Sequence, residues 1–165
     1  MELVDILNKR NEYTGEIKDR KALIENEYRN LVHIWIINDK KELLIQQRSF
    51  KKKHFPGLWS VTSSCVDSKE SLVDACIREC KEELNVELDI NNLEYMMSFK
   101  KDPVIVQVFV LYQNIDISKI ILQEEVSDMK FVTREELKTM MKENKTAGSI
   151  NYFEFFEKIL DKNIE

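Results

Sequence analysis

Apolar residues in this chain occur mainly in short runs of the kind that form strands. Two runs, 31–37 and 104–112, are rich in β-branched and aromatic residues and predict buried strands. The first run breaks at residues 38–40, so it should form a hairpin with the next apolar run, in a sheet covered on both faces. Further short apolar or alternating segments predict strands at 2–7, 43–45, 58–62, 95–100 and 129–132.

Three other segments have apolar residues at helical spacing. The first covers 71–84 and begins at Ser71 with the spacing of a capping box. A second capping box begins at Thr133 and opens a helix to about residue 142. Ser149 is expected to cap a last helix, which is rich in aromatic residues. Strands interleaved with three helices predict a mixed α/β or α+β sandwich.

Composition narrows the class of protein. The chain has 165 residues, of which 43% are hydrophobic and 33% charged, which indicates one globular domain spanning 1–165. With 25 Lys and Arg against 30 Asp and Glu, its net charge of -5 argues against a partner that is a nucleic acid polymer. No apolar stretch approaches the ~20 residues of a membrane span, and residues 1–20 lack an apolar signal core. Three cysteines, an odd number, favour a reducing compartment, so we expect a cytoplasmic protein.

The helix at 71–84 carries a cluster of carboxylates. On a helical wheel, Glu79, Glu82 and Glu83 fall in one sector of about 100° beside the apolar stripe. Carboxylates at these spacings repel one another, so the cluster indicates a bound cation. Oxygen ligands of this kind suit Mg²⁺ or Mn²⁺, which also bind substrate phosphates. A solvated acidic face, paired with Arg78 and Lys81, would give the same pattern.

The spacing around this cluster resembles the Nudix box, G-x5-E-x7-R-E-U-x-E-E-x-G-U, in which U is aliphatic. The box covers about 64–86, and its matching positions are Glu70, Arg78, Glu79, Glu82, Glu83 and Val86. Ser64 and Asn85 replace the two glycines, and Cys80 replaces an aliphatic residue. Asn85 suits the left-handed backbone expected just after a helix. Ser64 is less suited to a tight loop in which φ is expected to be positive.

The resemblance extends over about residues 1–140 to one branch of this superfamily. The segments 43–48 and 55–59 look like those of type I isopentenyl-diphosphate isomerases and of hydrolases similar to them. This resemblance implies an α/β/α sandwich around a mixed sheet, with the box helix in an outer layer. It also implies a Mg²⁺-dependent hydrolase that cleaves a phosphoanhydride bond in a nucleoside diphosphate derivative or a similar pyrophosphate.

The resemblance assigns roles to particular residues. Glu79, Glu82 and Glu83 would bind the metal, with Glu70 as a fourth candidate, and Arg78 would orient Glu79 or Glu82. The catalytic base would be a box glutamate or an acid in a later loop. The best loop candidate is Glu125, although a solvated loop acid is an equally good interpretation of that residue.

Other residues are candidates for contacts with a small-molecule diphosphate. Arg48 has a guanidinium that matches phosphate, Lys53 belongs to a basic run, and Trp59 could stack on a base. Trp35 and His33, by contrast, lie in an apolar strand and are expected to be core residues. The same holds for the two cysteines on the apolar helix stripe. An exposed face of the last helix could form a homodimer contact.

Two alternatives remain open at this point. An isomerase would need a cysteine and a histidine where this chain has Ser63 and Cys65, another histidine near Arg29, and an acid in the strand at 104–112. Cys65 could be a shifted nucleophile, so isomerase chemistry stays a minor alternative. The second alternative, suggested by Ser64, is a Nudix-fold binding or regulatory module that does not catalyse.

Overall fold

The computed structural model describes residues 2–164, with side chains up to residue 162. Its strands are β1 (Leu3–Leu7), β2 (Tyr13–Asp19), β3 (Arg29–Ile37), β4 (Leu43–Arg48), β5 (Trp59–Ser60), β6 (Thr62–Cys65), β7 (Leu93–Lys101), β8 (Val104–Tyr112) and β9 (Val126–Val132). Its α-helices are α1 (Leu72–Leu84), α2 (Arg134–Lys142) and α3 (Phe153–Ile164). Short 3₁₀-helices occur at Ile90–Asn92, Ile117–Lys119 and Gly148–Ile150. Within residues 2–164, no helix is long and apolar enough to cross a bilayer.

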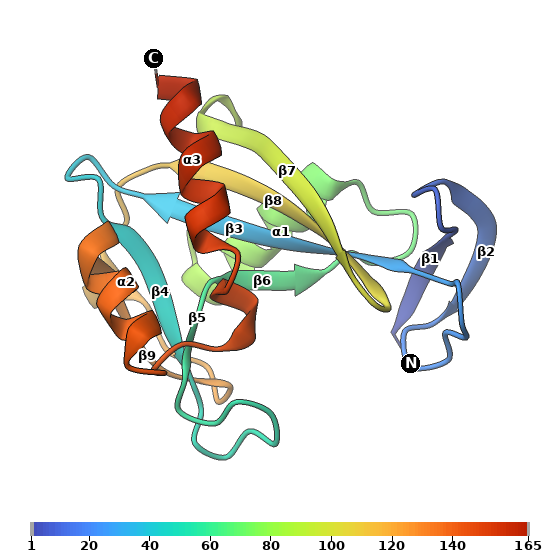
Figure 1. The fold of residues 1–165 in the computed structure, drawn as a ribbon, viewed down its shortest axis with the longest axis horizontal. Helices are drawn as coiled ribbons and strands as arrows, with labels where there is room; N and C mark the ends of the chain where they lie inside the picture. Colours follow the sequence, from blue (N-terminus) through green and yellow to red (C-terminus); the bar gives the residue numbers. More distant parts are fainter. Residues whose placement is uncertain (1, 165) are drawn as a thin grey trace.

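A mixed sheet forms the centre of the molecule (Figure 1). Its strand order is β5-β4-β3-β8-β7, with β6 paired to β3 and β9 paired to β4. Strands β3 and β8 run parallel along their whole length, whereas the other pairs are antiparallel. Strands β1 and β2 form a separate hairpin beyond one end of this sheet (Figure 1).

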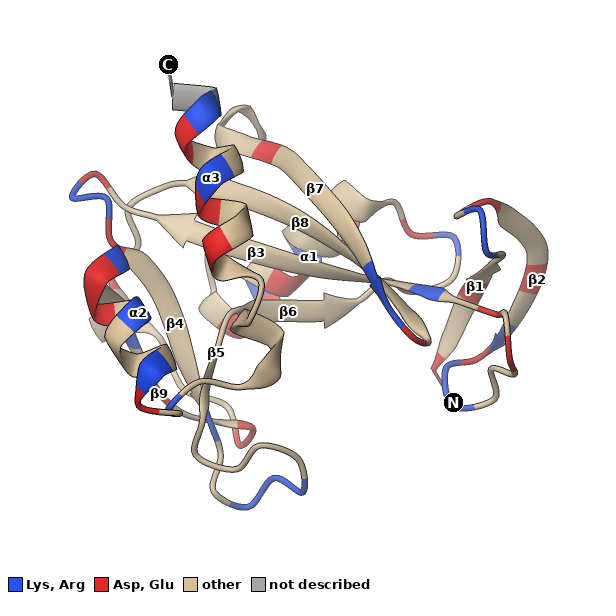
Figure 2. Ribbon diagram, viewed as in Figure 1, with Lys and Arg blue, Asp and Glu red and all other residues tan. Residues whose placement is uncertain are grey.

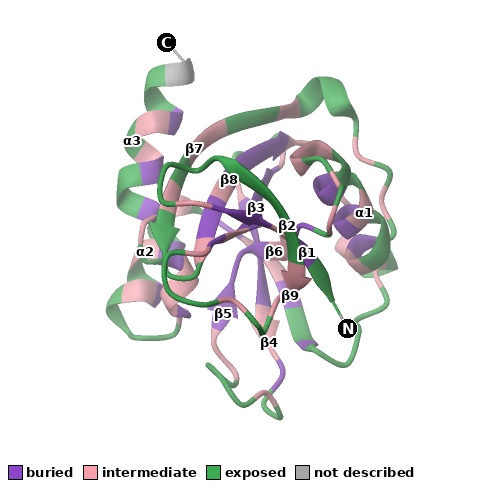
Figure 3. Ribbon diagram, turned by 90° about the vertical axis from the view of Figure 1, so that its right-hand side faces the viewer, coloured by how far each residue is buried: buried purple, intermediate pink, exposed green. Residues whose placement is uncertain are grey.

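Helices cover both faces of the sheet. On one face, Phe153 and Phe156 of α3 pack with Trp35, and α2 joins the same core. On the other face, Cys76 and Cys80 of α1 pack against the alternate side chains of β3. Figure 3 shows that the sheet is largely buried, whereas the outer strand of the hairpin is exposed. The predicted α/β/α sandwich is therefore confirmed, and so is the core position of Trp35 and of the two cysteines.

Three local predictions were wrong. Ser64 does not need a positive φ, because it lies in the extended strand β6 opposite Val32, and the predicted strand at 58–62 is in fact two strands, β5 and β6. Ser149 does not cap the last helix, because it lies inside a 3₁₀ turn, and α3 begins only at Phe153. The expectation for Asn85 is confirmed, since this residue closes α1 with a φ of 51°.

Candidate active site

Helix α1 sets the geometry of the site through its two ends and its buried edge. The Ser71 side chain accepts a hydrogen bond from the Asp74 amide at 3.0 Å, which fixes the first turn. At the other end, the left-handed backbone of Asn85 lets its amide bond to carbonyls of the last turn. With the cysteine stripe anchored on the sheet, the helical register directs Glu79 toward Ser64 of β6 and Glu83 toward Gln46 of β4.

The glutamates of α1 face a cavity of about 760 Å³. Its other walls come from the N-terminal hairpin, from β6 and from the loop before β9, far apart in the sequence. Its lining residues include Glu79, Glu82, Glu83, Arg78, Ser63, Ser64, Cys65, Arg20, Gln123 and Glu125. The fold therefore brings the predicted box acids and the loop acid Glu125 to one cavity.

Glu79 and Glu83 form a buried carboxylate pair. Glu79 is only 5% exposed, and burial raises its pKa, while hydrogen bonds with Glu83 and Ser64 act in the opposite direction. Burial also raises the pKa of Glu83, to about 8, and the charge of Glu79 adds to this shift. The Oε2 atom of Glu83 is buried and has no hydrogen-bond partner, although Gln46 reaches the same carboxylate. Two such groups cannot both ionise cheaply without a cation.

Arg78 is held most tightly by Glu70. Its Nε donates to Glu70 Oε2 at 2.8 Å and its Nη2 donates to Glu70 Oε1 at 2.9 Å, a bidentate ion pair. This pair lowers the pKa of Glu70. The same guanidinium lies 3.4 Å from a Glu82 oxygen and 3.9 Å from a Glu79 oxygen. Arg78 therefore contacts both predicted partners, and Glu70 serves to fix Arg78.

The remaining predicted residues are distributed unevenly around the cavity. Glu125 is 69% exposed and pairs with Lys52 at 3.0 Å. Arg48 lines a smaller hollow together with Glu83 and Glu125. Figure 2 shows the basic loop between β4 and β5 beside this region. Lys53 in that loop is exposed and is not among the residues that line either hollow.

Trp59 lies apart from the cavity. It is 9% exposed and packs in the core beneath α2 and α3, with Lys130 Nζ 4.5 Å from its ring centroid. The structure does not bring this ring to the acidic cavity. Sequence reasoning missed Gln46, Ser64 and Lys52 as neighbours of the carboxylates. Only Lys52 had a signal, as part of the basic run, because the other two become neighbours through strand pairing.

The donor set fits a hard divalent cation. Among the described residues, no three His, Cys, Asp or Glu side chains converge on a single point. Glu82 is 58% exposed and leans toward Arg78, whereas Glu79 and Glu83 face each other. The Oε2 atom of Glu83, buried and without a hydrogen-bond partner, is an oxygen ligand that a cation would contact.

In this chain a mixed sheet lies between helices, and three glutamates of one helix face a cavity. The NUDIX domain model matches residues 27–154, and the chain therefore belongs to the Nudix family, whose members include hydrolases.

Particular relatives agree with this assignment. The chain is 33% identical over 143 residues to an uncharacterised Nudix hydrolase of Listeria innocua, covering 85% of each protein. Its structure is similar to that of a Deinococcus radiodurans protein, with a TM-score of 0.76 and 25% identity over 96% of this chain and 99% of the other. It is also 36% identical over 93 residues to an isopentenyl-diphosphate Delta-isomerase of Shigella flexneri, covering 53% of this chain and 49% of that protein.

Proposed function

We propose that this protein is a Mg²⁺- or Mn²⁺-dependent hydrolase that cleaves a phosphoanhydride bond in a small diphosphate, such as a nucleoside diphosphate derivative. The observation that carries this proposal is the buried Glu79–Glu83 pair with its unpartnered oxygen. Nudix enzymes generally use divalent metals. A buried pair of carboxylates destabilises the fold unless a bound ligand offsets its charge. A hard cation is the ligand that suits carboxylate oxygens.

Each residue then has a definite part. Glu79, Glu82 and Glu83 would hold the ion, which when bound neutralises diphosphate charge and lowers the pKa of an attacking water. Near neutral pH, the pair Glu79–Glu83 retains a proton, which it would release on ion binding. Arg78, fixed by Glu70, holds Glu82 in place by a charge-assisted contact.

Residues outside α1 would provide the catalytic base and the contacts to the substrate. Glu125 is the candidate for the base, since it lies at the cavity on a loop separate from the three α1 glutamates. Arg48 and Lys52 would attract a polyphosphate toward the acids. The net charge of -5 makes such a local basic group useful for a small anionic substrate in the cytoplasm.

Two other functions lack support of this kind. Ser64 fits an extended strand, which removes the reason to suspect an inactive binding module. An isomerase would need an acid beside its cysteine, yet the side-chain partners of the Cys65 thiol are arginines.

A product screen over nucleoside diphosphate derivatives, dinucleotides and isoprenyl diphosphates tests the proposal, with Mg²⁺ and with EDTA. We expect metal-dependent cleavage of at least one member, and a loss of about 100-fold or more in Glu82→Gln. Glu87→Gln is the matched control, because Glu87 is 87% exposed and pairs with Lys81 rather than with a residue of the cavity. Cleavage that persists in EDTA would overturn the proposal. Isomerisation of an isoprenyl diphosphate that is lost in Cys65→Ala would overturn it in favour of the isomerase.

A further inference from the structure

Two arginines meet at Cys65 on the wall of the cavity. The Cys65 thiol accepts hydrogen bonds from Arg29 Nη1 at 2.9 Å and from Arg20 Nη1 at 3.4 Å. Arg20 comes from the N-terminal hairpin and, like Cys65, lines the cavity. Cys65 follows Ser64 in β6, so the two side chains lie on opposite faces of the strand. Ser64 faces Glu79, and the arginines therefore approach from the other face.

Among the described residues, these two cations have a single carboxylate, Glu2, within ion-pair distance. Among the described residues, no carboxylate lies within ion-pair distance of Arg29, and its Nε is buried without a hydrogen-bond partner. Arg20 pairs with Glu2. Because both guanidiniums contact one sulfur, their nitrogens are at most about 6 Å apart and repel each other. A thiol sulfur is a weak acceptor and compensates this repulsion poorly.

The backbone adds a donor at the same place. The Cys65 carbonyl accepts a hydrogen bond from Arg78 Nη2 at 2.9 Å, so it points away from β3. In an antiparallel strand, the N–H and C=O of one residue point to the same side, so the Cys65 amide also points to the outer edge of β6. At that edge, Ser63 and Cys65 line the cavity. Two guanidiniums and an outward amide are a combination that suits a phosphate oxyanion.

We propose that Arg20, which lines this cavity, and Arg29, which meets it at the Cys65 thiol, form an anion subsite at the cavity wall. This subsite binds a phosphate group other than the diphosphate at the glutamates. The proposed subsite rests on the proposed function only for what the rest of the bound ligand is. The glutamate end would need a cation to attract an anion, whereas the arginine end needs none. The subsite would thus select diphosphates that carry an additional phosphate, or bind free phosphate.

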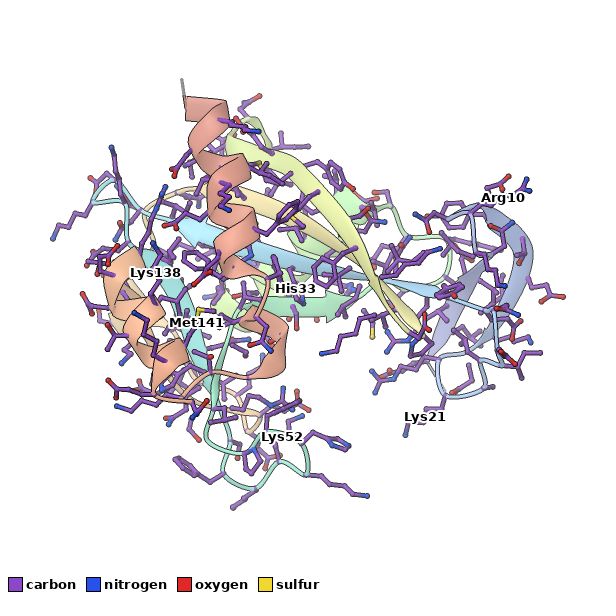
Figure 4. The ribbon with its side chains drawn as sticks, in the orientation of Figure 1. Arg10, Lys21, His33, Lys52, Lys138 and Met141 are labelled. Atoms are coloured by element: carbon purple, nitrogen blue, oxygen red, sulfur yellow. The ribbon has the colours of Figure 1, made fainter. Side chains whose placement is uncertain are left out.

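Phosphate binding in EDTA tests the subsite without the metal site. Inorganic phosphate would be titrated at constant ionic strength by calorimetry. We expect saturable binding, weakened about tenfold or more in Arg20→Gln. Arg29→Lys should also weaken it while retaining the charge, because the planar fork is lost. Arg10→Gln is the matched control, since Arg10 lies at the outer end of the same hairpin (Figure 4). No binding in EDTA, or equal affinities in Arg20→Gln and Arg10→Gln, would overturn the subsite.

Alkylation of the thiols locates the bound anion. Phosphate should slow the reaction of Cys65 with iodoacetamide in the wild-type protein and in Arg10→Gln, but not in Arg20→Gln. Cys76 and Cys80 are fully buried, and burial raises the pKa of each thiol to about 12, so they serve as unreactive internal controls. Binding that leaves the Cys65 rate unchanged would place the anion elsewhere and overturn the assignment.

A matched pair of ligands distinguishes the two sources of phosphate. NAD⁺ and NADP⁺ share a diphosphate, and only NADP⁺ carries an additional ribose phosphate. Preference for NADP⁺ that is lost in Arg20→Gln would support a substrate phosphate. Equal binding of both, with phosphate binding intact, would support the free anion. Failure of the subsite would leave Mg²⁺-dependent hydrolysis untouched, since that reaction depends on Glu82.

Discussion

Replacement of Glu83 by glutamine tests the central electrostatic argument. Burial and the neighbouring charge of Glu79 raise the pKa of Glu83 from 4.5 to about 8. Between these two values, the folded protein retains a proton that the unfolded chain has lost. The free energy of unfolding must therefore fall as the pH rises through this range. Glutamine has nearly the same shape but no charge, so it removes this dependence.

The structure sets the size of the effect. One pKa unit corresponds to about 1.4 kcal/mol, so a shift from 4.5 to about 8 allows at most about 5 kcal/mol. We expect about half of this, because the open cavity lets solvent screen the charge. In EDTA, the wild-type protein should thus lose about 2–3 kcal/mol more than Glu83→Gln between pH 5.5 and pH 8.

Urea unfolding at the two pH values measures this difference. Glu87→Gln is the control for loss of an exposed carboxylate near the same helix end. Burial lowers the pKa of His33 to about 4, so its unfolded form takes up a proton below about pH 6.5 and stability rises with pH there. This opposite trend is common to all three proteins and cancels in the comparison. Equal pH dependence in the wild type and in Glu83→Gln would refute the argument.

Three further predictions concern residues around the site and the core. Arg78→Lys keeps the charge but loses the planar guanidinium that binds Glu70, so Mg²⁺ affinity measured by calorimetry should fall about 10- to 100-fold. Unchanged affinity would mean that the guanidinium does not position the glutamates. Asn85→Ala places a side chain less tolerant of a positive φ at the end of α1 and should lower the free energy of unfolding in urea by about 1 kcal/mol, whereas Asn85→Gly should not lower it. Tyr152→Phe removes the hydroxyl that accepts from Trp35 Nε1 at 2.7 Å, which should cost about 1–3 kcal/mol in the same assay. A cost near zero would show that water replaces that hydroxyl.

The sequence alone was enough to define the architecture and the helix that carries the acids. Hydrophobic periodicity depends on neighbours in the chain, so it placed α1, α2 and the buried strands β3 and β8 close to their observed bounds. The spacing of Glu79, Glu82 and Glu83 likewise follows from the helical repeat. Asn85 was interpretable because left-handed backbone is a local property of one residue.

Tertiary structure decided everything that depends on strand pairing and on separate loops. Serine suits position 64 because β6 pairs with β3 in an extended conformation, and no local sequence pattern predicts this pairing. Trp59 and Lys53 were predicted at the substrate, yet the fold buries the first in the other core and leaves the second exposed in its loop. The pKa of Glu83 and the meeting of two arginines at Cys65 arise from burial and from contacts between residues distant in sequence. Electrostatic energies depend on distance and solvent access in three dimensions, and a linear sequence specifies neither until the chain has folded.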